Sequence, residues 1–368
     1  MDFFTFRSFR VRRGILSALI ASAIFQPANA DDWQLDDFQS DSKQIIGGVW
    51  QGNATLGQYS YGEVRLEQGA RWNGDLISDV DRQNFSDGGH FYINLADDSV
   101  WNGHVSGVVN LTFEARDSAF NGNINILGQI NANLAASRYQ GDISVNGDVN
   151  SQSAINFNLT EASQWHGNVQ VDYSNLSVDL EDGSLWAGSV EGSNVNAEIS
   201  VDRNSVWQGS VANLMNDPNA AGNHQITVKR NSQWFGDSIL QIDATNSLSA
   251  QKTITVENDS RWLGNGGLQI DNASDWSSYA TIRVTEGSVW QGDFTLAGQG
   301  FSHIQIDYGS AWQGNLVLND FIIGNQPNYL YINRSDWRGH IQGGGADTDV
   351  LLSDSQWTIT GSSRLNIL

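Results

Sequence analysis

The sequence predicts an all-β fold, a single-stranded, right-handed parallel β-helix of about fourteen coils. The first observation is the stretch 302–318, SHIQIDYGSAWQGNLVL, in which apolar and mostly polar side chains alternate. An alternation with a period of two indicates an extended chain with one apolar face. The second observation is that this pattern, centred on an aromatic residue, recurs at steps of 19 to 29 residues. Repeats of this length are typical of solenoids, and they are too short for a four-stranded propeller blade.

The repeat unit is Ser-x-aromatic-x-Gly, and we number its positions from the aromatic residue as zero. Gly stands at +2 in thirteen copies, Ser at −2 in twelve and Trp at zero in twelve. In the copy centred on Trp312, aliphatic residues occupy −8, −6, +4 and +6. The fourteen residues at position zero are Trp50, Trp72, Trp101, Phe120, Tyr139, Trp165, Trp186, Trp207, Trp234, Trp262, Trp290, Trp312, Trp337 and Trp357.

The aromatic and aliphatic positions share one parity, which predicts that the rings form a buried column inside the rod. A buried indole N–H needs an acceptor. The Ser hydroxyl at −2 is one candidate, although it could equally satisfy backbone groups at a corner. Gly at +2 either leaves space beside the indole or permits a bend. The alternative is an exposed Trp platform that binds carbohydrate, and for that role Trp276 and Trp33, outside the repeat, are the better candidates.

The chain divides into three regions. Residues 1–30 have the features of a signal peptide: a basic segment, an apolar segment at 14–25 and a small-x-small cleavage site, Ala28-Asn29-Ala30. The apolar segment is too short to span a bilayer, and we expect no transmembrane segment after its removal. Residues 31–44 are an acidic, polar lead-in that we predict to be an N-terminal cap. Residues 45–368 carry the repeat without a break in composition, which predicts one β-helical domain.

The long steps predict loops that leave the coils on one side of the rod. Pro218 and Pro327 fall in such loops, as expected, because proline would remove a ladder hydrogen bond from an interior strand. Loops on a rigid scaffold are where binding is usually found. The predicted loops are 78–89, 213–223, 243–251, 265–280 and 319–328.

The charge of the chain is strongly negative. It carries 41 acidic and 19 basic residues, and without residues 1–30, which hold one acid and four bases, the net charge is 15 − 40 = −25. This excess argues against nucleic acid as a partner. Many acids precede the Ser-x-Trp motif, where they form either a cation-binding edge or a solvated corner, and we favour the corner. They are Asp97, Asp98, Glu161, Glu181, Asp182, Asp202, Glu257, Asp259, Glu286, Asp307 and Asp336.

The motifs of known catalytic and metal sites are absent from the sequence. It has no Cys, no Gly-x-Ser-x-Gly and no His-Glu-x-x-His, and its six His are scattered. Residues 343–352, GGGADTDVLL, fit one copy of a Ca²⁺-binding nonapeptide repeat, but such sites need several stacked copies, so a turn is favoured. We therefore predict no catalytic, cofactor-binding or metal-binding residue, and no cofactor.

A signal peptide followed by Ser-x-Trp-x-Gly coils resembles the passenger region of autotransporters, the pertactin-like and AIDA-type adhesins of Gram-negative bacteria. Residues 353–368, SDSQWTITGSSRLNIL, are similar to a motif near the C-terminal part of such passengers. The resemblance covers residues 45–368. It implies a pectin-lyase-like β-helix stalk, exported through the inner membrane to the cell surface, the medium or the periplasm. It also implies host-cell, matrix or bacterial surface ligands, protein or glycan. Family members continue into a translocator β-barrel, which we expect this chain to lack.

Two function hypotheses follow. The first is a non-enzymatic, adhesin-like scaffold, or a cryptic truncated autotransporter without activity. The second is a polysaccharide-active β-helix enzyme of the pectate-lyase or polygalacturonase kind, which would need acids and bases gathered on one outer face. The bases near acids are Lys229, Arg230, Arg261 and Arg283, which we place in repeat turns. Because an enzyme site usually breaks the repeat, we favour the scaffold.

Overall fold

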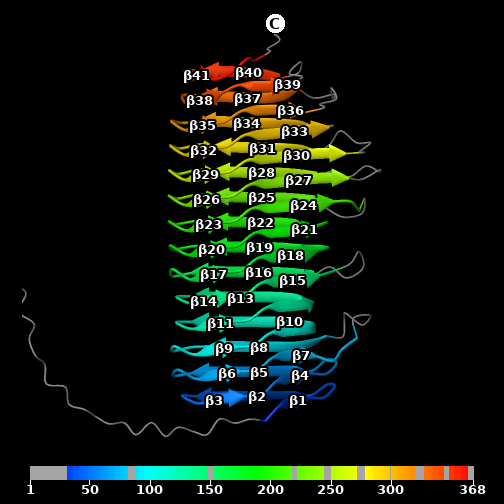
Figure 1. Ribbon diagram of the computed structural model, residues 1–368. Helices are drawn as coiled ribbons and strands as arrows, with labels where there is room; N and C mark the ends of the chain where they lie inside the picture. The colour runs from blue at the N-terminus through cyan, green and yellow to red at the C-terminus, as the bar shows by residue number, and fades with distance from the viewer. Residues whose placement is uncertain are drawn as a thin grey trace, which may run out of the picture.

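The computed structural model describes residues 31–81, 88–147, 153–217, 222–243, 250–271, 278–298, 300–319, 327–343 and 348–363. Within these ranges every regular element is a β-strand, and the strands stack into a rod whose colour runs from blue at one end to red at the other (Figure 1). All pairings are parallel between successive coils. The predicted parallel β-helix is therefore confirmed.

Each coil contributes three strands in the order sheet B, sheet C, sheet A. Sheet A consists of β3 (Val49–Gln51), β6 (Arg71–Asn73), β9 (Val100–Asn102), β11 (Ala119–Asn121), β14 (Arg138–Gln140), β17 (Gln164–His166), β20 (Leu185–Ala187), β23 (Val206–Gln208), β26 (Gln233–Phe235), β29 (Arg261–Leu263), β32 (Val289–Gln291), β35 (Ala311–Gln313), β38 (Asp336–Gly339) and β41 (Gln356–Ile359). Fourteen strands at the usual spacing correspond to a rod about 65 Å long.

Sheets B and C are joined by the long strand β10, which belongs to both. Sheet B consists of β1 (Trp33–Leu35), β4 (Ala54–Leu56), β7 (Leu76–Ser78), β10 (Val105–Arg116), β12 (Ile124–Leu127), β15 (Ile143–Asn146), β18 (Val169–Asp172), β21 (Val190–Ser193), β24 (Val211–Met215), β27 (Ser238–Asp243), β30 (Gly266–Asp271), β33 (Phe294–Gly298), β36 (Leu316–Asn319) and β39 (Ile341–Gly343). Sheet C consists of β2 (Ser40–Ile46), β5 (Tyr61–Glu67), β8 (Gly89–Leu95), β10, β13 (Gln129–Ala135), β16 (Ser153–Thr160), β19 (Ser174–Leu180), β22 (Asn196–Val201), β25 (Gly222–Val228), β28 (Ala250–Val256), β31 (Tyr279–Val284), β34 (Phe301–Asp307), β37 (Asn328–Asn333) and β40 (Thr348–Ser353).

The residues at position zero form one continuous column along sheet A, as predicted. Each pairs in register with the next, from Trp50 with Trp72 to Trp337 with Trp357. Successive ring centroids lie 4.2–5.7 Å apart with interplanar angles of 3–24°. The thirteen rings from Trp50 to Trp337 are at most 2% exposed.

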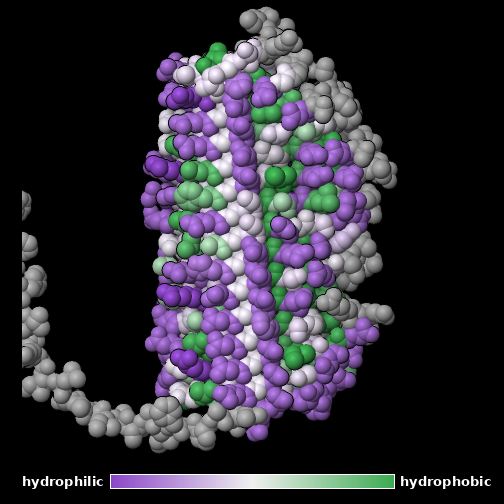
Figure 2. Space-filling model, in the orientation of Figure 1, coloured by the Kyte–Doolittle hydropathy of each residue, from purple (hydrophilic) through white to green (hydrophobic). Residues whose placement is uncertain are grey.

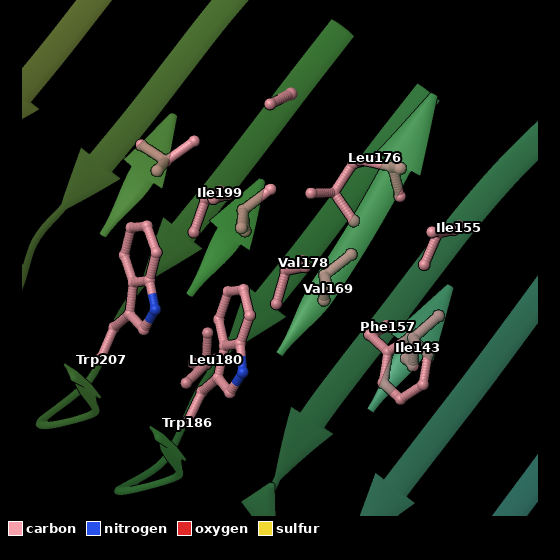
Figure 3. Close-up of a cluster of buried hydrophobic side chains, with 14 of the residues drawn as sticks. Ile143, Ile155, Phe157, Val169, Leu176, Val178, Leu180, Trp186, Ile199 and Trp207 are labelled. Atoms are coloured by element: carbon pink, nitrogen blue, oxygen red, sulfur yellow. The ribbon is translucent and has the colours of Figure 1, made fainter. Parts of the chain in front are cut away.

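Aliphatic side chains from sheets B and C fill the rest of the interior. Figure 3 shows the rings of Trp186 and Trp207 lying parallel in neighbouring coils, with Val178 and Ile199 from sheet C directed into the same interior. Burying such apolar surface contributes about 25 cal/mol per Å². Because each coil adds its own share, the core grows with the number of coils and has no preferred centre.

The acceptor of the indole N–H is the backbone, not the Ser hydroxyl that the sequence suggested. The eleven column Trp residues after Trp50 each donate to the carbonyl of the +2 Gly in the preceding coil, at 2.8–3.2 Å. At Gly209, a Cβ would overlap the Gly188 carbonyl oxygen and lie 3.0 Å from Nε1 of Trp207. Glycine is therefore required at +2 for space beside the indole, which was one of the two roles considered.

The Ser hydroxyls take the alternative role and satisfy backbone groups at a corner. In most coils from Ser118 onward, the amide at −2 donates to the Ser Oγ of the next coil at 3.0–3.2 Å, as from Ser184 to Ser205. Several hydroxyls donate in turn to a carbonyl of the turn before them, as Ser163 does to Thr160 at 2.7 Å. Buried backbone groups at the corner are thereby paired.

The strands begin before residue 45, because β1 pairs with β4 and β2 pairs with β5. Two charged side chains of this first coil lie against its aromatic core. Nζ of Lys43 lies 4.3 Å from the ring centroid of Trp50, and Trp33 donates to Asp41 at 3.1 Å. These charges cover the first ring of the column.

The predicted loops all connect a sheet B strand to the next sheet C strand, so their described flanks share one side of the rod. Their extent was overestimated, because β30 (Gly266–Asp271) occupies much of the loop predicted for 265–280. The central parts of all five predicted loops lie outside the described residues, as does Pro218. Pro327 lies just before β37, outside a strand.

Gly209→Ala is expected to lower the free energy of unfolding by about 3 kcal/mol, because the new methyl group would displace the carbonyl that Trp207 binds. Gly267→Ala is the matched control, since a Cβ there would have no heavy atom closer than 3.8 Å. Urea unfolding followed by Trp fluorescence measures both variants. Equal loss of stability in the two would contradict the role given to the +2 position.

Candidate functional site

Many of the acids that precede the Ser-x-Trp motif lie in the turns between sheets C and A. Two consecutive residues in these turns have positive φ, for example Asp97 at 54° and Asp98 at 61°. The amide of Ser99 closes that turn on the carbonyl of Ala96 at 3.3 Å. Such turns favour Gly, Asn and Asp at both central positions. These acids therefore occupy a backbone conformation that suits them.

Two of the acids are not solvated, contrary to the corner interpretation. Asp202 is 1% exposed and Asp307 is 2% exposed. Asp202 accepts from Nε of Arg230 at 2.6 Å and lies 3.6 Å from Nζ of Lys229. Arg203, next to Asp202, lies 2.9 Å from Asp182 of the coil before and also pairs with Glu181. The buried charge of Asp202 is therefore paired with cations of the next coil, because a buried carboxylate without a partner is costly. Asp307 instead accepts from the side-chain amide of Gln305.

The bases considered for the enzyme hypothesis are not brought together. Lys229 and Arg230 pair with Asp202 in a turn, whereas Arg261 lies in β29 of sheet A and Arg283 in β31 of sheet C. Placing Arg261 and Arg283 in turns was wrong. Among the described residues, no group of three or more His, Asp or Glu side chains is arranged to hold a metal ion. The single Ca²⁺-like copy at 343–352 lies partly outside these ranges.

One carboxyl on the outer face of sheet C has an altered acidity. Partial burial raises the pKa of Asp179, and the nearby Glu198 carboxylate acts in the same direction, while Lys229 opposes both. The register pairs Asp179 with Ser200 on the next strand. A raised pKa beside a second carboxylate is a feature that acid–base chemistry uses. Sequence reasoning missed this pair because it depends on which residues become neighbours between coils.

A hollow of about 360 Å³ lies on the same sheet, nearer the N-terminal end. Its lining includes Asn133 and Asn158, which are neighbours in register. Arg116 reaches across the intervening coil to Glu161 at 2.8 Å. This pair is exposed, and exposed pairs stabilise a fold by at most about 1 kcal/mol. The lining combines these amides and charges with leucine and alanine residues, such as Leu134 and Ala96.

Two basic side chains lie inside the rod at position −10, which has the same parity as the apolar positions. His224 and Lys252 are neighbours in register on β25 and β28, and they are 1% and 0% exposed. Nζ of Lys252 donates to the carbonyl of Gly267 at 2.9 Å and to that of Ser238. Neither ring nitrogen of His224 has a partner among the described residues. Burial lowers the pKa of Lys252 well below its ordinary value and that of His224 to about 3.

A second polar column, at position +3, was missed in the sequence. In every coil from Asn53 to His340, the +3 amide donates to the side chain one coil earlier, at 2.7–3.1 Å. Asn, Asp, Ser or His occupies +3 in all of these copies, which was the available signal. Figure 2 shows that hydrophilic side chains form a continuous column along the rod axis.

The exposed-Trp alternative fails where the structure tests it. Trp33 is 6% exposed and packs edge-on against Trp50 with ring centroids 6.3 Å apart. Trp33 lies in β1 of the first coil, and no copy of the motif precedes β1 in the sequence. Trp276 lies outside the described residues.

No family model, curated protein or solved structure matches this chain. Within the described ranges, no helix has the length and apolar character needed to cross a bilayer. Function is therefore inferred from the residues and the fold alone.

Lys252→Met is expected to flatten the pH dependence of stability between about pH 5.5 and pH 9, a range in which ordinary carboxylates stay ionised. Burial lowers the pKa of Lys252 and His224 from 10.5 and 6.5, while Asp237 opposes the shift of Lys252. The unfolded chain then binds more protons, so stability falls as pH falls, by up to about 1.4 kcal/mol per pH unit for each group.

Urea midpoints at several pH values measure this slope. Arg283→Met, which removes an exposed cation from the neighbouring strand β31, is the matched control and should keep the slope of the unmodified protein. Parallel curves for Lys252→Met and the unmodified protein would contradict the role of the buried amine.

Proposed function

We propose that this protein is an exported, adhesin-like β-helical scaffold that acts without catalysis, similar to an autotransporter passenger. The observation that carries the proposal is the unbroken register of position zero through fourteen coils of sheet A. A regular rod of this kind offers extended polar faces held rigidly by paired ladders. Rigid scaffolds of repeats commonly present such faces and their loops to other molecules.

The proposed location is the cell surface, the medium or the periplasm of a Gram-negative bacterium, reached through the signal peptide in residues 1–30. That segment lies outside the described residues, so its sequence features carry this part of the proposal. The proposed ligands are protein or glycan groups on host cells, matrix or bacterial surfaces. The high negative charge of the chain makes nucleic acid an unsuitable partner.

Expression of the full chain in a Gram-negative host is expected to yield a product that begins at Asp31, in an exported fraction. N-terminal sequencing of each cell fraction measures the cleavage. Ala28→Arg with Ala30→Arg is the matched control and should block cleavage, because the site requires small residues. An uncut cytosolic product from the unmodified gene would contradict export.

A polysaccharide-active enzyme is the second candidate, and the raised pKa of Asp179 beside Glu198 is the observation that favours it. The scaffold proposal predicts saturable binding of the purified protein to cell or matrix surfaces, with no sugar released from polygalacturonate. Both assays should be run on the same preparation, together with Asp179→Asn. Product release by the unmodified protein that Asp179→Asn abolishes would replace the scaffold proposal with the enzyme.

A further inference from the structure

A glycine, Gly267, leaves a gap between larger side chains on the outer face of sheet B. The register places Gly267 between Ile239 in the coil before and Thr295 in the coil after. A Cβ added at Gly267 would have the Cγ1 of Ile239, at 3.8 Å, as its nearest neighbour. The result is a hollow of about 440 Å³ around this glycine. One neighbour, Ile239, is 46% exposed and offers an apolar wall.

One rim of the hollow is the +3 ladder, here composed of Asp237, Asn265 and Asp293. The ladder uses one oxygen of each carboxylate. Oδ1 of Asp237 accepts from the Asn265 amide at 2.7 Å, and Oδ1 of Asp293 accepts from the Asn315 amide at 2.8 Å. Among the described residues, no hydrogen bond is directed to Oδ2 of either aspartate. Two carboxylate oxygens therefore remain available to a ligand.

The donors around the hollow are largely engaged. The side-chain amide of Asn265 donates to Asp237 at 3.2 Å, and that of Gln269 donates to Asp271 at 2.7 Å. The backbone amides of β30 pair within the sheet. The polar groups that remain free are mostly hydrogen-bond acceptors, so the hollow requires a ligand rich in donors. A sugar hydroxyl both donates and accepts, whereas a guanidinium only donates.

The charge of the hollow is also one-sided. Its rim carries two carboxylates and no basic side chain. Lys252 lies behind the same strand, inside the rod, and its amine is bound to the Gly267 carbonyl at 2.9 Å. Burial lowers the pKa of that amine, which reduces the charge that it could set against the aspartates. The net charge of the whole chain, −22, adds to the attraction of a cation.

The distance between the two aspartates limits each kind of cation to one of them. They are two coils apart, or about 9.5 Å at the usual strand spacing. A Ca²⁺ ion, with ligands at about 2.3–2.6 Å, would reach only one of them. An ammonium is similarly compact. A guanidinium cannot bridge the two either, but its planar fork places several N–H donors beside one carboxylate, while its methylene stem packs on an apolar wall.

We infer that the hollow at Gly267 binds an arginine side chain carried on an extended segment of a partner protein. Ile239 contacts the methylene stem, and the guanidinium donates to the free oxygen of either Asp237 or Asp293. The inference rests on the proposed function as a binding scaffold and names the chemistry of one partner class.

The test measures binding of a fluorescent pentapeptide, Gly-Ser-Arg-Ser-Gly, to the purified full-length protein by anisotropy. The same peptide with citrulline, an uncharged shape match, should not bind, and the lysine peptide should bind more weakly. Gly267→Leu fills the hollow, and the double change Asp237→Asn with Asp293→Asn removes its charge while Asn can keep the ladder. Each is expected to weaken binding at least tenfold.

Two matched controls are expected to stay within twofold of the unmodified protein. Ala212→Leu enlarges an exposed side chain one coil away from Ile239 on the same face. Asp142→Asn removes a ladder carboxylate far from the hollow. Should Gly267→Leu fail to fold, the double aspartate variant decides. Unchanged binding in the double aspartate variant would overturn the site. An equal loss in Asp142→Asn would also overturn it and leave only a general charge effect.

These outcomes separate the inference from the proposed function. If the unmodified protein adheres to whole cells but does not bind the arginine peptide, the arginine site alone is overturned. If the unmodified protein does not adhere to cells, the scaffold proposal fails, whatever the peptide result.

Discussion

Each column Trp after Trp50 binds a glycine carbonyl of the preceding coil, and much of the rod depends on this hydrogen bond. It satisfies two polar groups that would otherwise be buried unpaired, the indole N–H and the inward carbonyl. It also ties neighbouring coils together at one defined pair of residues, as Trp207 binds Gly188. The steps between coils range from 19 to 29 residues, yet sheet A keeps its alignment. The extra residues leave between sheets B and C, where the bond is not disturbed.

The polar columns solve the same problem at the corners. Ser at −2 and the Asn, Asp, Ser or His at +3 accept amides of neighbouring coils, so the chain can turn repeatedly without leaving buried donors unpaired. Because these columns run along the rod, they also present acids and amides at fixed intervals on its surface. A binding face built in this way derives its spacing from the strand repeat. The hollow at Gly267 uses that spacing, with an aspartate on either side of an empty position.

The sequence predicted the fold and the buried column because the parity of a strand shows which face each side chain takes. Parity does not show where a carbonyl points, so the glycine carbonyl was not among the acceptors considered for the Trp N–H. Trp33 was predicted to be exposed because no copy of the motif precedes it, so the repeat pattern did not place it inside a coil. His224 and Lys252 are single exceptions on neighbouring strands, and a repeat pattern cannot signal that a single basic residue is buried. The pair Asp179 and Glu198, like the hollow, arises from register between coils, which depends on the exact length of every loop.

The most direct test of the account is hydrogen exchange of the Trp indole N–H groups, measured by nuclear magnetic resonance on protein labelled with ¹⁵N at Trp. Central column residues such as Trp207 and Trp234 are 0% exposed and bonded to a carbonyl at 2.9 Å. Their indole protons should exchange as slowly as the most protected backbone amides of sheet A. Exchange of these central indole protons within minutes at neutral pH, with the backbone amides still protected, would contradict the central hydrogen bond.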